Sequence, residues 1–170
     1  PSSSAFDSLE LPADAPATAG PAPLAGALPE VLADALGRLE AGARFEAPDA
    51  FDPLYGYTRQ HPEDPRGYLV LARAFMARGY RSAAFSRYGY AFRLAPERAK
   101  RDPQVLTDLV DIAARASDPG VEGRVLRLLR QHYGPEALPA VEAAEEASTR
   151  RAVKTRLSRL QASLEASTPR

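Results

Sequence analysis

From residue 28 onward, apolar residues recur at intervals of three and four, which is the spacing of one face of an α-helix. The pattern first appears at Leu28, Leu32, Leu36 and Leu39, and later segments repeat it. No window shows the sustained alternation of apolar and polar residues that is typical of a half-buried strand. The pattern therefore predicts an all-α fold.

Aspartate–proline pairs mark the expected helix starts. An aspartate side chain can accept the free amides of a first helical turn, and proline fits the first helical position, where no hydrogen bond is lost. The pairs are Asp52-Pro53, Asp64-Pro65, Asp102-Pro103 and Asp118-Pro119. The corresponding helix ends are expected at the glycines that follow apolar segments, Gly42, Gly79 and Gly134.

Short helices joined by short turns are typical of antiparallel helical hairpins. We expect a first hairpin at Leu32–Gly42 and Pro53–Pro62, with an insertion between its helices. A further hairpin is expected at Pro103–Ala116 and Pro119–Tyr133. Residues 135–148 and 149–166 are expected to form a closing helix pair.

Between these hairpins, residues 65–98 carry large and small apolar residues at fixed intervals. The series is Tyr68, Leu71, Ala72, Phe75, Ala84, Tyr88, Ala91 and Pro96, with Gly79 at the turn. This segment resembles a tetratricopeptide repeat, with tyrosine and alanine in the places of the usual tryptophan and glycine. The resemblance implies an antiparallel helical-hairpin solenoid of about three hairpins, followed by capping C-terminal helices. Most of the aromatic residues are then core residues, and only Tyr80 and Tyr90 are expected to be exposed.

Three regions are expected along the chain. Residues 1–26 are rich in proline, alanine and serine and predict a disordered linker, in which Phe6, Leu9 and Leu11 either reflect chance composition or form a small docking motif. Residues 27–147 form the repeat domain, and residues 148–170 a basic amphipathic helix. An apolar stripe on that helix, Val153, Leu157, Leu160 and Leu164, predicts a cap on the last repeat, with a coiled-coil or membrane-surface role as the alternative.

The formal net charge of zero conceals blocks of opposite sign. Residues 1–64 carry a net charge of −8, residues 65–134 of +7, residues 135–149 of −4 and residues 150–170 of +5. Such blocks favour contacts between segments, or acidic partners for the basic block, unless they are only solvated helix faces. Nucleic-acid binding is a weaker alternative, because the arginines lie on every helix face and the aromatic residues are expected inside.

No catalytic motif is present, so the sequence predicts a protein that is not an enzyme and has no cofactor or small-molecule substrate. The two histidines, His61 and His132, sit at expected helix ends, where they suit capping rather than catalysis or metal binding. The carboxylates Glu142, Glu145 and Glu146 on an alanine-rich helix are expected to face solvent.

The expected function is protein–protein interaction, through a concave groove lined by the first helix of each hairpin. Facing away from the core stripe, these helices present an apolar strip with guanidinium and other polar groups, which suits a peptide with acidic and apolar side chains. The expected groove residues are Arg66, Leu69, Val70, Arg73, Met76, Ala77, Gln104, Thr107, Asp111 and Arg115. Arg73→Ala is expected to weaken binding and to leave stability nearly unchanged. The alternatives are packing of these residues within the chain, and a homo-oligomerisation module that uses the C-terminal helix.

A looser resemblance covers residues 28–165. It is carried by "RDPQVLTDLVDIAA", "VLRLLRQHYGPEALPAVEAA" and the Arg- and Ala-rich closing helix. In these segments the chain is similar to the helical-repeat regions attached to bacterial serine/threonine protein kinases. The resemblance implies an adaptor, or the recognition part of a larger signalling protein.

The chain starts at a proline with no charged-then-apolar leader, which suggests a fragment or a processed product. It has no apolar run near the ~20 residues of a membrane span. The absence of cysteine does not fix the compartment. The cytoplasm is the expected location, with the periplasm as the alternative if the chain is tethered beyond a membrane segment.

Overall fold

The computed structural model describes residues 27–166. Every regular element in this range is a helix, and no strand occurs there, so the all-α prediction is confirmed. The expected linker, residues 1–26, lies outside the described residues. The helices are α1 (Glu30–Glu40), α2 (Asp52–Gln60), α3 (Pro65–Arg78), α4 (Arg81–Leu94), α5 (Pro96–Lys100), α6 (Pro103–Arg115), α7 (Pro119–His132), the 3-10 helix η1 (Gly134–Ala137), α8 (Leu138–Ala147) and α9 (Arg151–Glu165).

The helix boundaries follow local chemistry. Asp64, Asp102 and Asp118 cap α3, α6 and α7, each accepting a hydrogen bond from the amide two residues later. Asp52 also opens a helix but makes no such bond, because Phe51 occupies the capping position of α2. The three glycines expected at helix ends all have positive φ angles, at Gly42, Gly79 and Gly134. Glycine adopts this left-handed conformation without the steric penalty of a Cβ atom.

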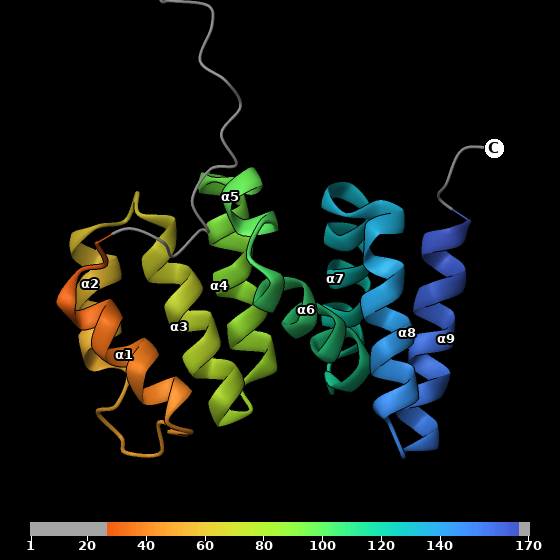
Figure 1. Ribbon diagram of the computed structural model, residues 1–170, viewed down its shortest axis with the longest axis horizontal. Coiled ribbons are helices and arrows are strands. Elements are labelled where there is room, and N and C mark those ends of the chain that lie inside the picture. The colour runs from red at the N-terminus through yellow and green to blue at the C-terminus, as the bar shows by residue number, and fades with distance from the viewer. Residues whose placement is uncertain (1–26, 167–170) are drawn as a thin grey trace, which may run out of the picture.

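The helices stand side by side in a row from α1 and α2 to α8 and α9 (Figure 1). Consecutive helices pack in pairs, α1 with α2, α3 with α4, α6 with α7 and α8 with α9. The α3–α4 pair is the most extensive, and Ala72 and Ala84, the small residues of its two helices, are both fully buried. Small side chains let the backbones approach, while larger neighbours such as Tyr88 fill the space beside them.

α3 contacts α1, α2, α4 and α6, so it is enclosed on most sides. Nine of its fourteen residues are buried. A helix that has neighbours on several sides buries residues on more than one of its faces. These aromatic residues are divided between core and surface as expected. Tyr68 and Phe75 are buried, and Tyr80 and Tyr90 are exposed.

One element was not expected from the sequence, the short helix α5 between α4 and α6. The insertion expected between α1 and α2 is present, and it is held by Phe45, which is 3% exposed and has a φ of 54°. Its ring stacks on Phe51 at 5.8 Å between ring centroids.

The last helix closes the row. α9 packs against both α8 and α6, and its apolar stripe, Val153, Leu157, Leu160 and Leu164, is buried. The stripe is therefore covered by the chain itself. Of the helices formed by residues 27–166, none combines the length and apolar character required to cross a membrane.

Candidate functional site

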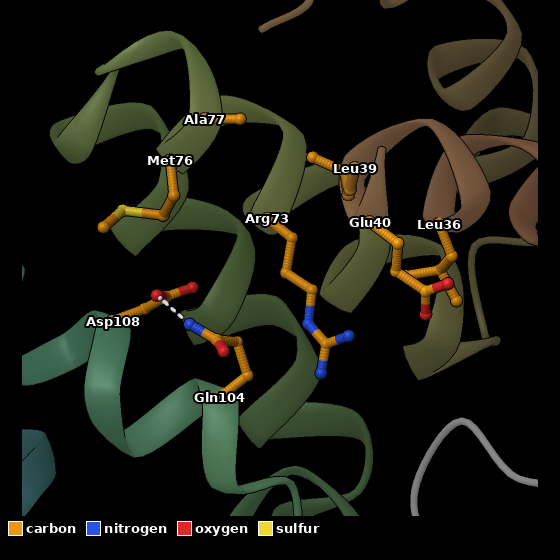
Figure 2. A pocket seen from close by; sticks show the side chains of 8 residues that line it. All are labelled: Leu36, Leu39, Glu40, Arg73, Met76, Ala77, Gln104 and Asp108. Atoms are coloured by element: carbon orange, nitrogen blue, oxygen red, sulfur yellow. Dashed lines mark hydrogen bonds between the residues drawn. The ribbon is translucent and has the colours of Figure 1, made fainter. Parts of the chain in front are cut away.

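An open pocket of about 310 Å³ lies where α1, α3 and α6 meet. We call it the central pocket. Its lining joins an apolar side to a polar side, and Figure 2 shows the side chains converging from the three helices. The central pocket is lined by Leu36, Leu39 and Glu40 of α1, Arg73, Met76 and Ala77 of α3, and Gln104 and Asp108 of α6.

Arg73 extends across the pocket, and its guanidinium group lies between Gln104 and the α1 side chains (Figure 2). Its Nη2 atom forms an ion pair with the carboxylate of Asp102, which is 3% exposed. The Nε atom of Arg73 is buried and has no hydrogen-bond acceptor among the described residues. A buried donor without a partner is unfavourable.

Asp108 forms the inner wall of the polar side. One carboxylate oxygen accepts a hydrogen bond from the hydroxyl of Tyr88, and the other accepts one from Gln104 Nε2 at 2.7 Å (Figure 2). Burial raises the pKa of Asp108 above its usual value, and the bonds from Tyr88 and Gln104 oppose that rise. Burial likewise raises the pKa of Tyr88 well above its usual value. This hydrogen-bonded group fixes Gln104 at the pocket edge.

The apolar side consists of half-buried aliphatic chains. Leu36, Leu39 and Met76 pack against the hydrophobic core while part of each side chain stays accessible. A methionine side chain adapts to different apolar shapes. Glu40, at the end of α1, adds a carboxylate on the edge opposite Gln104 (Figure 2). The pocket thus offers an apolar floor between polar groups of both signs.

The structure brings four of the expected groove residues together in the central pocket, Arg73, Met76, Ala77 and Gln104. It places Leu69 and Val70 elsewhere, because both are completely buried. Their expected position in the groove is therefore wrong. The physical reason is the enclosure of α3 by α1 and α2 as well as by α4 and α6.

The remaining expected groove residues do not line this pocket. Arg66 is held by Asp64 at the start of α3, with an Nη2–Oδ2 distance of 2.8 Å. Thr107 is exposed, and its hydroxyl donates to the carbonyl of Pro103. Asp111 and Arg115 form an ion pair with each other at 2.8 Å. Asp111 also pairs with Arg81 of α4, and Arg115 lines a separate hollow beside the start of α4.

Sequence reasoning missed Leu36, Leu39, Glu40 and Asp108 as pocket residues. Leu36 and Leu39 were assigned to a core stripe, yet the stripe is only half-covered at the end of α1. Asp108 follows Gln104 by four residues, a spacing that places two side chains on one face of a helix. That spacing was a usable signal for the polar wall.

The histidines lie apart from the central pocket. His61 contacts the ring of Tyr57 and His132 the ring of Phe92, each at 4.6 Å between centroids. Across residues 27–166, no group of three histidine, aspartate or glutamate side chains is placed to hold a metal ion. The arrangement in the central pocket suits binding through hydrogen bonds and apolar contacts.

Comparison with known proteins yields no match, since no family model, curated protein or solved structure is similar to this chain. The resemblance to tetratricopeptide repeats accordingly rests on the sequence pattern.

Proposed function

We propose that the chain is a tetratricopeptide-like interaction scaffold that binds a peptide segment of a partner protein in the central pocket. The observation that carries the proposal is the buried Nε of Arg73, which has no acceptor among the described residues and belongs to a side chain that lines an open pocket of about 310 Å³. A small movement of this side chain would let an oxygen of a bound peptide accept the Nε hydrogen. In a stacked helical-hairpin array, α1, α3 and α6 are the helices that line the binding surface.

The lining indicates which peptide fits best. An aliphatic side chain would contact Leu36, Leu39 and Met76 and lose its contact with water. Gln104 and Arg73 would bind backbone or carboxylate oxygens beside it. The preferred segment therefore has one aliphatic anchor next to an amide side chain or a free backbone carbonyl, since the carboxyl groups of Glu40 and Asp108 lie in the same pocket.

The scaffold is proposed as a non-catalytic module, and the resemblance to kinase-attached repeat regions supports a place in a larger bacterial signalling protein in the cytoplasm. The alternative of self-association through α9 has less support. The apolar stripe of that helix, including Leu157 and Leu164, is buried against α6 and α8. Little apolar surface of the described part of α9 is left for a second copy.

The test is selection from a displayed library of random peptides, followed by affinity measurement with one selected synthetic peptide. Met76→Glu places a charge on the apolar floor, and Ala77→Phe fills the pocket. We expect each variant to weaken binding by about tenfold or more, which corresponds to about 1.4 kcal/mol. Arg59→Glu, on the exposed surface of α2, is the matched control and should bind normally.

Unfolding curves for all variants would separate loss of binding from loss of structure. The proposal is wrong if no peptide is selected, or if the selected peptide binds Met76→Glu and Ala77→Phe as well as it binds the original chain.

A further inference from the structure

A second hollow, of about 380 Å³, lies between α4 and α7. It combines three guanidinium groups with apolar side chains, and no carboxylate is among its described lining residues. We call it the arginine groove and define it by Phe85, Gly89, Arg93, Arg124, Arg127 and Leu128.

The positive charges of this groove are poorly neutralised. Arg124 lies 3.9 Å from Asp118, but the two side chains are 58% and 55% exposed, so this ion pair is weak. Arg93 lies over the ring of Tyr90 at 4.2 Å, a contact that leaves its charge in place. Within the described chain, neither Arg93 nor Arg127 has a carboxylate at ion-pair distance.

Two other hollows differ in this respect. The central pocket contains the carboxyl groups of Glu40 and Asp108. In the hollow beside the start of α4, Arg81 and Arg115 are both paired with Asp111. Of these three hollows, the arginine groove is the best suited to an acidic and apolar occupant.

Gly89 contributes to the shape of the arginine groove. It lies within α4, where glycine is less favourable than every residue except proline. A Cβ atom at this position would have no atom within 4 Å apart from its two chain neighbours and the nearby backbone of α4, so packing does not require glycine. The missing side chain leaves the floor of the arginine groove open.

We propose that the acidic segment Phe6–Leu11 of this same chain occupies the arginine groove. Residues 1–26 contain three acidic residues and no basic one. Asp7 and Glu10 are three residues apart, as are Phe6 and Leu9. The carboxylates pair with the groove arginines, while the apolar side chains contact Phe85 and Leu128.

The segment reaches the groove from where the described chain begins. The carbonyl of Ala27 accepts a hydrogen bond from Arg66 Nη1 at 3.4 Å, beside the start of α3. The rings of Tyr68 and Tyr90 stack at 5.2 Å between centroids, which places the start of α3 next to the end of α4. Arg93 lies at that end of the arginine groove.

The length of the intervening chain is sufficient. Residues 12–26 separate the segment from Ala27 and can span about 50 Å when extended. A compact domain of about 140 residues has a radius of gyration of about 14 Å. A tether of this length gives an effective concentration on the order of 1 mM, so a weak contact is enough to keep the segment bound. An acidic partner of the groove would then have to displace the chain's own segment.

The experiment uses the full chain, whose lack of cysteine allows one spin label at Ser4→Cys. The nitroxide broadens the amide NMR signals of residues near it. We expect the signals of Gly89, Arg124 and Leu128 to lose at least about half of their intensity relative to the reduced label, while those of α1 and α9 keep theirs.

Arg124→Glu/Arg127→Glu should abolish this broadening, since both arginines are exposed and their reversal repels the segment. Arg59→Glu/Arg151→Glu, which changes the net charge equally at exposed sites on α2 and α9, should leave it intact. Asp7→Arg/Glu10→Arg should restore the broadening in the first variant. Gly89→Leu should block it while the melting midpoint stays equal or rises.

Several results would overturn the proposal. They are an absence of broadening in the original chain, broadening centred on Met76 and Leu39 of the central pocket, or broadening that survives reversal of Arg124 and Arg127. Broadening in a mixture of spin-labelled unenriched chain and unlabelled ¹⁵N-enriched chain would assign the contact to a second copy, and would also contradict it.

Discussion

The hydroxyl of Tyr88 in α4 donates a hydrogen bond to the carboxylate of Asp108 in α6, inside the hydrophobic core. Tyr88 is fully buried, and Asp108 is 6% exposed. The same carboxylate binds Gln104 at the edge of the central pocket. A single buried acid thus joins the most extensive helix pair to the proposed binding surface.

Tyr88→Phe should destabilise the fold by about 1–3 kcal/mol, because it leaves the buried carboxylate of Asp108 with one hydrogen-bond donor fewer. Urea unfolding would measure the change. The double variant Tyr88→Phe/Asp108→Ala should lose less stability than the sum of the two single variants. Strict additivity would mean that the hydroxyl and the carboxylate do not interact.

Arg73→Ala should also destabilise the protein, by about 1–3 kcal/mol, since it leaves the buried carboxylate of Asp102 without its guanidinium partner. The sequence alone predicted nearly unchanged stability for this variant, and the ion pair to Asp102 is the reason for the revised expectation. Arg59→Ala, at an exposed position, is the control and should leave the unfolding free energy within about 0.5 kcal/mol. Equal unfolding curves for the two variants would show that the ion pair contributes nothing to stability.

Asp64→Asn should lower stability in a pH-dependent way. Burial alone raises the pKa of Asp64, but hydrogen bonds from Arg66 and Tyr57 outweigh burial and lower the pKa to about 2. The folded-state pKa lies below the unfolded value of about 3.9, so the carboxylate stabilises the fold above about pH 4 and loses this effect as pH falls through about 2.

At neutral pH the Asp64→Asn variant should be about 1–2 kcal/mol less stable than the original chain, because asparagine can still cap α3 but carries no charge to pair with Arg66. Chemical unfolding at a series of pH values would follow the difference, which should shrink between about pH 4 and pH 2. A difference that stays constant over this range would rule out a titrating carboxylate as its source.

Leu71→Ala should lower the free energy of unfolding by about 2–5 kcal/mol, because the Leu71 side chain in α3 is completely buried. Leu94→Ala makes the same chemical change at a side chain that is 43% exposed and should cost much less. Thermal unfolding followed by circular dichroism would compare them. An unchanged midpoint for Leu71→Ala would contradict its place in the core.

Much of the fold could be predicted because its signals are local. An aspartate followed by proline caps a helix using atoms within the same turn, which is why the starts of α3, α6 and α7 were found from the sequence. The turn glycines were recognisable for the same reason, since a left-handed residue ends a helix regardless of its surroundings.

The candidate site was predictable only in part, because it depends on which helices become neighbours. Helical periodicity placed Val70 on an outer face, and it is buried because α3 is enclosed by α1, α2, α4 and α6. The partner of Arg73 lies 29 residues away along the chain, so no local pattern identifies it. The short helix α5 has no distinctive signal either, beyond the proline at its first position.

The aromatic residues around the insertion between α1 and α2 affect which part of the molecule unfolds locally first. A row of helix pairs tends to fray from its ends, because a terminal pair has a neighbour on one side only. Here Phe51 lies 4.8 Å from Phe75 between ring centroids, and Phe45 stacks on Phe51 at 5.8 Å. These rings join the first pair to α3, so the amide hydrogens of α2 should exchange with solvent almost as slowly as those in the middle of the row.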